Sequence, residues 1–558
     1  MFSPAFITLA LFGVVGLCKV YEDVADLPTL RYDFVVVGGG TAGNVVANRL
    51  TENPNVSVLV LEAGPSNEGV LDSEVPFFMA NLLTANAYNW NYTTTPQSGL
   101  NGRTIGYGSA HILGGGSAHS KYPVRTHITD GMVYSRGAQD DFDRYAALTG
   151  DEGWSWKQIL PYFLKSEKWT PPEDQHDTQG QFDPSVHGRD GPISVSLTGF
   201  PWSELEGRVI QTTKELPDDF PFNLDMNSGQ PLGIVYMQST IGGGERSTSA
   251  TGYLAPKFIQ RPNLHVLLHA QVSKLVNVTQ HQGKPGFGGV QFRYGTSLFV
   301  AEASKEIILS AGSIGTPQIL LNSGVGDHTA LEALGLPTVL DLPSVGQNAS
   351  DHGFVGADWA VNSNQTIESI TQNTTRFDQA FEQWNTSRTG PFVDALGTHI
   401  AWLRLAADSP AFETHADPSP GPGAPTSSKY PGGITGGVGH FVGFALAMVS
   451  PVSRGSVTLS SSDPFATPLI DPGLLADDFD MIALTEGVAL IQKFLTAAAW
   501  NGYMARRRMS PRGAQHGVVD PDLTSRVLRP IVPGAHTQAA TYAVAERGAD
   551  LVKKRWTL

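Results

Sequence analysis

Three glycines and one acidic residue near the start of the chain form a pattern that could hold the diphosphate of a dinucleotide. Gly38, Gly40 and Gly43 follow an apolar run at residues 34–37, and Glu62 ends a second apolar run 24 residues after Gly38. The first glycine permits a tight turn, the second lets the backbone approach a pyrophosphate, and the third allows close packing of helix on strand. The acid is placed to accept hydrogen bonds from ribose hydroxyls. The pattern predicts a bound dinucleotide; the alternative interpretation is a structural turn.

This chemistry requires a strand, a glycine turn, a helix and a second strand, in that order. The N-terminus of the helix would offer free N–H groups and a positive dipole end to phosphates. Beyond this unit, the pattern of apolar and turn-forming residues predicts helices at residues 151–163, 477–495 and 542–554, strands at 264–276 and 306–310, and a long surface loop at 417–437.

Other reactive residues form weaker patterns. His265 and His269 would share one face of the predicted strand, but no third metal ligand is evident, so packing or solvent exposure is the favoured interpretation. The single cysteine, Cys18, excludes an intrachain disulfide and redox chemistry by protein thiols. No Gly-x-Ser-x-Gly, P-loop or paired-cysteine motif offers a rival centre.

Bulk composition indicates a folded, acidic protein. The 558 residues are too many for one ordinary core, so two intertwined domains are expected. The formal net charge of -15 argues against nucleic acid and anionic membrane surfaces as partners, and a solvated acidic surface is the simpler interpretation. The sequence predicts a monomer.

The N-terminal residues 1–18 contain an apolar run that is too short to span a bilayer and is typical of a secretory signal peptide, although a basic start is missing. The alternative is an N-terminal element packed on the domain. Seven Asn-x-Ser/Thr sequons support secretion and predict glycosylation at Asn55, Asn91, Asn277, Asn348, Asn364, Asn373 and Asn385.

From residue 30 onward the chain resembles the glucose–methanol–choline (GMC) flavoprotein oxidoreductases, and most of all their fungal aryl-alcohol oxidase branch. Three motifs carry the resemblance. The first is the glycine turn with its helix, the second is Gly-Ser-Ile-Gly-Thr-Pro-Gln within residues 312–326, and the third is Gly-Ala-His-Thr-Gln at residues 534–538.

The resemblance implies an α/β protein that binds FAD. It implies a Rossmann-like FAD domain from residues 30–150, 240–350 and 505–558, and an α+β substrate domain on an antiparallel sheet from residues 151–239 and 351–504. By resemblance, the residues that contact the cofactor are Gly38, Gly40, Thr41, Ala42, Gly43, Glu62, Gly114, Gly115, Ser117, Val272, Ala535 and Thr537. The alternative for Val272 is an ordinary strand position.

The reaction implied by the resemblance is alcohol oxidation. A histidine accepts the hydroxyl proton while hydride leaves the carbon for flavin N5, and a neutral imidazole suits that role. The flavin then passes electrons to dioxygen or a quinone. His536 is the expected substrate-orienting residue and the candidate to stand in as the base, and its alternative is a histidine that begins a helix with no flavin near it. Tyr92 is expected to stack on an aromatic substrate, with a packed core tyrosine as the alternative.

The chain departs from the family pattern at the flavin end. Three arginines at residues 506–508 stand where a His-Pro segment with the usual catalytic base is expected, and a strand is missing after residues 520–523. About ten additional residues, 121–129, interrupt the flavin loop, and His111 replaces a usual Arg or Lys. His516, close to the shortened region, is a weaker candidate to replace this base. Either the gene model has misplaced introns or the protein is decayed or repurposed.

The sequence therefore predicts an FAD-dependent oxidase or dehydrogenase that converts a primary aryl or allylic alcohol to the aldehyde. A secondary metabolite is an equally acceptable substrate. Two other hypotheses remain open: a catalytically impaired remnant, and a non-redox lyase of the hydroxynitrile type.

Overall fold

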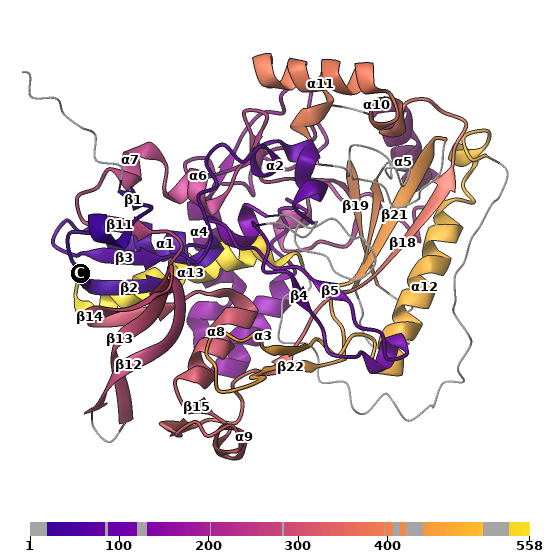
Figure 1. Ribbon diagram of the computed structural model, residues 1–558. Helices are drawn as coiled ribbons and strands as arrows, with labels where there is room; N and C mark the ends of the chain where they lie inside the picture. Colours follow the sequence, from indigo (N-terminus) through magenta and orange to yellow (C-terminus); the bar gives the residue numbers. More distant parts are fainter. Residues whose placement is uncertain are drawn as a thin grey trace, which may run out of the picture.

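The computed structural model describes residues 19–83, 87–119, 131–200, 202–281, 284–395, 397–404, 413–419, 439–505 and 535–558. Figure 1 shows a mostly parallel sheet on one side of the molecule and an antiparallel sheet on the other, with helix α13 extending between them. Among these residues, no helix is both long and apolar enough to span a membrane.

The first sheet has seven strands in the order β1-β11-β3-β2-β14-β13-β12. The strands are β1 Val20–Tyr21, β11 Leu264–Leu267, β3 Val58–Leu61, β2 Arg31–Val37, β14 Ser297–Leu309, β13 Lys284–Tyr294 and β12 Gln271–His281. The first five pair in parallel, and β14, β13 and β12 pair in antiparallel fashion. Because parallel strands are buried on both faces, the runs of Val and Leu in β2 and β3 are nearly continuous.

Helices cover both faces of this sheet. On one face, α1 (Thr41–Leu50) and α13 (Thr537–Trp556) pack with Phe34 and Val36 of β2 in one apolar cluster. On the other face, Val35 packs with Ile319 of α8 (Gly312–Asn322). The predicted strand–turn–helix–strand unit is therefore confirmed.

The second sheet has five antiparallel strands in the order β18-β21-β20-β19-β8. They are β18 Gly353–Ala360, β21 Phe441–Met448, β20 Glu413–Ser419, β19 His399–Arg404 and β8 Gly233–Tyr236. Helices α5 (Ser203–Glu215) and α12 (Asp478–Phe494) pack on one face, in a cluster with alternate residues such as Leu403. The other face carries Ile400 and Trp402, which share a cluster with Ala535.

Helix α13 connects the two sheets. Its 20 residues give a length of about 30 Å at the usual rise per residue. Ala535 lies just before its N-terminus against the antiparallel sheet, whereas Trp556 at its C-terminal end donates to Glu306 of β14 over 2.9 Å. Helix α4 (Trp156–Ser166) packs beside α13, with Phe163 in the same cluster as Ala543.

The remaining elements are short or peripheral. The helices are α2 Leu71–Glu74, α3 Gln139–Thr149, α6 Ser249–Tyr253, α7 Pro256–Ile259, α9 His328–Ala333, α10 Glu368–Thr371 and α11 Thr374–Ser387. The short strands are β4 Tyr92–Thr93, β5 Gly106–Tyr107, β6 Glu167–Trp169, β7 Ile193–Val195, β9 Ile241–Gly242, β10 Glu245–Arg246, β15 Val325–Gly326, β16 Leu340–Asp341, β17 Gln347–Ala349, β22 Gly455–Thr458 and β23 Leu469–Asp471.

Four element predictions need correction, and in one of them the helix predicted at 542–554 is longer, Thr537–Trp556. The helix predicted at 151–163 begins only at Trp156, because the preceding residues form a separate turn with Asp151 as its cap. The strand predicted at 264–276 is two strands, β11 and β12, with His269 at a positive φ of 56° between them. Of the loop predicted at 417–437, the first three residues belong to β20, and the rest lies outside the described residues.

Candidate functional site

The first glycine turn has the geometry that its sequence predicts. Gly38 has a φ of +96°, which only glycine adopts without strain. A Cβ on Gly43 would lie 2.0 Å from the carbonyl oxygen of Gly38, so the side chain must be absent for α1 to pack against the turn. The roles predicted for these two glycines, the tight turn and the close helix packing, are confirmed.

The second glycine loop packs directly on the first. Gly114 donates its N–H to the carbonyl of Gly39 over 2.8 Å, and the N–H of Ser117 reaches Thr41 Oγ1 at 3.2 Å. A Cβ on Gly115 would lie 2.7 Å from the Cα of Gly40. Two segments about 75 residues apart in sequence thus form one continuous backbone surface.

Two polar side chains clasp these loops, and both were missed by the sequence analysis. Asn44 donates to Gly39 O over 2.9 Å and to Ser249 Oγ over 3.0 Å. Ser249 Oγ also lies 3.1 Å from Gly40 O, and its N–H donates to Ser117 Oγ over 2.9 Å. Asn44 and Ser249 are 205 residues apart, so no local pattern could have paired them.

The cradle suits a diphosphate. Helix α1 begins after Gly40, and no side chain caps its N-terminus among the described residues. Its first N–H groups therefore need acceptors from elsewhere, and phosphate oxygens supply them. Thr41 begins the helix, and Ala42 packs against the apolar cluster of the sheet. The residues present thus fit the pyrophosphate of FAD.

Glu62 stands at the end of β3, where the ribose is expected. Its carboxylate accepts the N–H groups of Gly39 and Gly64, each over 2.8 Å. Burial raises the pKa of Glu62 to about 7, against the lowering effect of these hydrogen bonds. The Glu62 carbonyl accepts the N–H of Ala270 over 2.8 Å, which brings the start of β12 and the half-buried Val272 to this corner. The adenine contact of Val272 stays a prediction.

His536 lies at the N-terminal end of α13, next to the antiparallel sheet. It is only 3% exposed, and it is the N-cap residue of the helix. Its ring lies edge-on to Trp402, with centroids 6.2 Å apart. Burial, together with the nearby His352, lowers the pKa of His536 to about 3, so the imidazole is neutral at physiological pH. A neutral ring retains a nitrogen that can accept a proton.

The neighbours of His536 differ in accessibility. Ala535 is fully buried against the antiparallel sheet, whereas Thr537 is exposed at the start of α13. The N–H of His536 donates to Ser135 Oγ over 3.1 Å. The flavin contacts predicted for Ala535 and Thr537 remain predictions.

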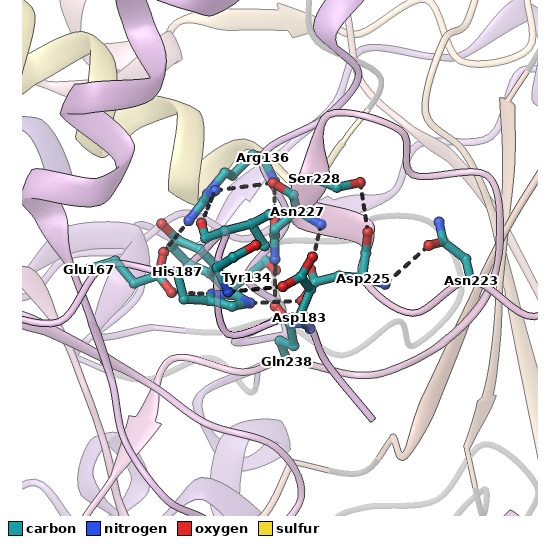
Figure 2. Close-up of polar contacts among 12 residues, drawn as sticks. Tyr134, Arg136, Glu167, Asp183, His187, Asn223, Asp225, Asn227, Ser228 and Gln238 are labelled. Atoms are coloured by element: carbon teal, nitrogen blue, oxygen red, sulfur yellow. Dashed lines mark hydrogen bonds and ion pairs between the residues drawn. The ribbon is translucent and has the colours of Figure 1, made fainter. Parts of the chain in front are cut away.

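A buried charged cluster lies behind Ser135, and the sequence analysis missed it as well. Figure 2 shows Arg136, Glu167, His187 and Asp225 joined in a chain of ion pairs. Asn227 connects this cluster to the backbone on both sides of Ser135. The four charged side chains are at most 2% exposed, so the cluster is part of the interior.

Tyr92 is a packed side chain. It is 8% exposed, its ring stacks on Trp90 at 5.8 Å, and it shares an apolar cluster with Ile314. This cluster is separate from the one that contains Ala535. His111 lies against Trp90, with centroids 4.4 Å apart, so it too contributes to packing. A substrate contact of Tyr92 stays a prediction.

The remaining predicted features either lie away from these two regions or fall outside the described residues. His265 is buried in β11, whereas His269 lies exposed beyond the end of that strand at a positive φ, so the two histidines do not share a strand face. Within the described ranges, no cluster of three potential metal ligands occurs. The insertion at 121–129, the arginines at 506–508, residues 509–512 and His516 lie outside the described residues. All seven sequon asparagines are exposed: Asn55, Asn91, Asn277, Asn348, Asn364, Asn373 and Asn385.

Comparison with known proteins agrees with this geometry. The GMC oxidoreductase N-terminal family matches residues 32–354, and the C-terminal family of GMC oxidoreductases matches residues 451–515. The chain is 38% identical to dehydrogenase eriK of Hericium erinaceus, with 98% of each chain covered. It is 36% identical to a pyranose dehydrogenase of Agaricus campestris, covering 100% of this chain and 99% of the relative.

A solved fungal aryl-alcohol oxidase shares the fold, with a TM-score of 0.72, 24% identity, and coverage of 94% of this chain and 99% of that chain. The alignment with the Hericium dehydrogenase extends over 606 residues although this chain has 558, so the relative has residues that this chain lacks. The glycine cradle, the two sheets and these matches show that the chain belongs to the GMC oxidoreductase family of FAD-dependent enzymes.

Proposed function

We propose that this protein oxidises a primary alcohol on an aryl or allylic carbon to the aldehyde, with His536 orienting the hydroxyl group. The observation that carries the proposal is the buried, neutral imidazole of His536 at the end of α13 that lies farthest from the dinucleotide sheet. FAD, when bound, supplies the acceptor for the hydride that leaves the carbinol carbon.

The residues of this chain supply position and proton transfer. The two glycine loops and Glu62 hold the ADP half of the cofactor, while α13 has its C-terminal Trp556 against β14 and its N-terminal end against the antiparallel sheet. At His536 a neutral ring nitrogen accepts a hydrogen bond, and then the proton, from the substrate hydroxyl. His352 lowers the pKa of His536 and is therefore a second imidazole close to that ring.

The apolar surroundings of His536 favour a hydrophobic alcohol. Its neighbour Ala535 packs in an apolar cluster with Met132, Met226, Met237, Ile400 and Trp402. Aromatic and methionine side chains stabilise flat apolar groups, whereas a sugar ring would need several hydrogen-bonding partners there.

A second candidate is oxidation of a sugar hydroxyl. The favouring observation is the 36% identity with a pyranose dehydrogenase over the whole chain. Both candidates use the same hydroxyl-orienting role of His536, and they differ in the polarity of the side chains needed around the rest of the substrate.

An anaerobic reduction experiment tests the proposal. The purified protein is expected to carry oxidised flavin that loses its visible absorbance with benzyl alcohol and not with a pyranose. Reduction by the pyranose alone would favour the sugar candidate. Bound flavin that no alcohol reduces would favour the impaired remnant or the lyase, and a protein without flavin would refute both redox candidates. Sequencing the transcript across residues 117–131 and 500–535 tests the misplaced-intron explanation.

The same proposal includes the localisation and modification of the protein and its electron acceptor. The exposed sequon asparagines and the apolar N-terminal run support secretion and glycosylation of the protein. The electron acceptor is dioxygen or a quinone. Mass spectrometry of the mature protein tests both the cleavage near residue 18 and the glycans.

A further inference from the structure

The buried cluster in Figure 2 contains two positive and two negative side chains. Arg136 Nη2 contacts Glu167 Oε2, and His187 Nδ1 contacts Glu167 Oε1. His187 Nε2 lies 2.8 Å from Asp225 Oδ2. We call these four residues, together with Asn227, the Arg136 network.

His187 is doubly protonated in this network. Each of its ring nitrogens faces a carboxylate oxygen, and only an imidazolium can donate from both nitrogens at once. The charges of Arg136 and His187 then balance those of Glu167 and Asp225. Because a buried charge is costly without a partner, this balance explains how four ionised groups are tolerated in the interior.

The Arg136 network ends at the backbone that holds His536. The Asn227 side chain accepts the N–H of Arg136 over 2.7 Å and donates to the carbonyl of Tyr134 over 3.0 Å. These two groups belong to the peptide units on either side of Ser135. Ser135 Oγ in turn accepts the N–H of His536 over 3.1 Å.

Asn227 is itself held from two sides. Its backbone N–H donates to Asp225 Oδ1 over 2.8 Å, and its backbone carbonyl accepts from Arg136 Nη1 over 3.1 Å. Its amide nitrogen also donates to Gln238 Oε1 over 2.6 Å. A rotation of the Asn227 side chain would therefore break several hydrogen bonds at once, which makes its position rigid.

We propose that Asn227 and Ser135 are positioning residues for His536, and that the ion pairs of the Arg136 network keep Asn227 in place. The proposal rests on the proposed function of His536. Ser135 fixes the position of the α13 N-terminus, and thereby the distance between the His536 imidazole and a bound hydroxyl. A shift of a few tenths of an ångström there weakens a hydrogen bond that the reaction requires.

The test uses the FAD-loaded enzyme and two pairs of variants. Ser135→Ala removes the acceptor for the His536 N–H, whereas Ser135→Thr retains a hydroxyl. Asn227→Ala removes the clamp on both sides of Ser135. The matched control is Ser453→Ala, because Ser453 is also buried and its Oγ accepts the N–H of Asp477 over 2.9 Å at the outer helix α12.

Two readouts are measured. The ¹⁵N imidazole resonance of His536, assigned with His536→Gln, reports its position without any substrate. The second readout is kcat and KM with benzyl alcohol. For Ser135→Ala we expect a shifted resonance, unchanged flavin content, and kcat lower by about 2- to 12-fold at constant KM, the effect of one lost neutral hydrogen bond. Ser135→Thr is expected to restore both values, and Asn227→Ala to exceed the effect of Ser135→Ala.

The proposal is overturned if Ser135→Ala and Asn227→Ala lower only the melting temperature and leave the resonance and kcat as Ser453→Ala does. That result would assign the cluster a structural role alone. Failure of the proposed function would look different, because the wild-type flavin would then not be reduced by any alcohol while the resonance would still report the positioning.

Discussion

Replacing Glu62 by glutamine removes a titrating group from the centre of the cofactor cradle. Burial raises the pKa of Glu62 to about 7, whereas the same side chain has its ordinary value of 4.5 in an unfolded chain. A raised pKa means that the folded protein binds the proton more tightly. The stabilising effect is complete below pH 4.5 and is lost as the pH rises through about 7.

The difference between the two pKa values corresponds to about 3 kcal/mol of unfolding free energy. FAD-depleted wild-type protein should therefore lose about this amount of stability between pH 4.5 and pH 7 from Glu62 alone. In Glu62→Gln this component should vanish. The assay is urea unfolding at several pH values, with the midpoint of the variant compared with that of the wild type.

The same substitution should weaken FAD binding. Glu62 is placed to accept hydrogen bonds from ribose hydroxyls, and a hydrogen bond to a charged group contributes about 1.5–3 kcal/mol, or about 10- to 150-fold in affinity. Glu206→Gln is the control, since Glu206 also has a raised pKa but lies in α5, away from the cradle. Equal pH slopes in the wild type and Glu62→Gln, or undiminished FAD affinity, would refute the reasoning.

Four further predictions concern the cradle and the interior. Gly43→Ala places a Cβ 2.0 Å from Gly38 O and should abolish FAD retention, measured by the flavin absorbance of the purified protein. Arg136→Met leaves the buried network with one uncompensated carboxylate charge and should cost about 3–5 kcal/mol, measured by denaturant unfolding. The pKa of His187 is raised by its carboxylate partners despite burial, so its contribution to stability is complete below pH 6.5 and should fall as the pH rises through the higher folded value. His536→Gln should keep its flavin and slow reduction by benzyl alcohol about 10²- to 10⁴-fold, measured by anaerobic stopped flow.

Each of these outcomes has a counterpart that would contradict it. A Gly43→Ala protein with full flavin would show that α1 can move without loss of the site. An Arg136→Met protein of unchanged stability would mean that a carboxylate of the network takes up a proton from solvent, so that no excess charge stays buried. Constant wild-type stability between pH 6.5 and pH 9 would contradict a charged His187, and an unchanged reduction rate in His536→Gln would place the proton acceptor elsewhere.

Local signals predicted the cradle because its constraints act over short distances. The spacing of Gly38 and Gly43 predicts the strand–turn–helix unit, and the structure shows why each lacks a side chain. The final helix was predicted from Tyr542, but it begins at Thr537, with His536 in extended backbone conformation at the N-cap position. The strand at 264–276 was predicted as one element, since apolar alternation continues across the turn at His269.

The residues that hold the site together could not be predicted in this way. The Asn44–Ser249 clasp and the hydrogen bonds from Asn227 to the peptide units on either side of Ser135 join residues from distant parts of the chain. Their types are common in loops and carry no spacing signal. The Arg136 network has the same origin, because its members are ordinary surface residue types that packing brings into the interior.

By itself, the sequence determined the dinucleotide-binding unit, because sterically required glycines and a regular apolar period leave a local record, and its resemblance to the GMC flavoproteins implied the family and FAD. Only the tertiary structure decided that the two glycine loops form one surface, that His536 is buried and neutral, and that a charge-balanced cluster stands behind it. The physical reason is desolvation, which depends on what the folded chain brings around a group and not on its neighbours in sequence.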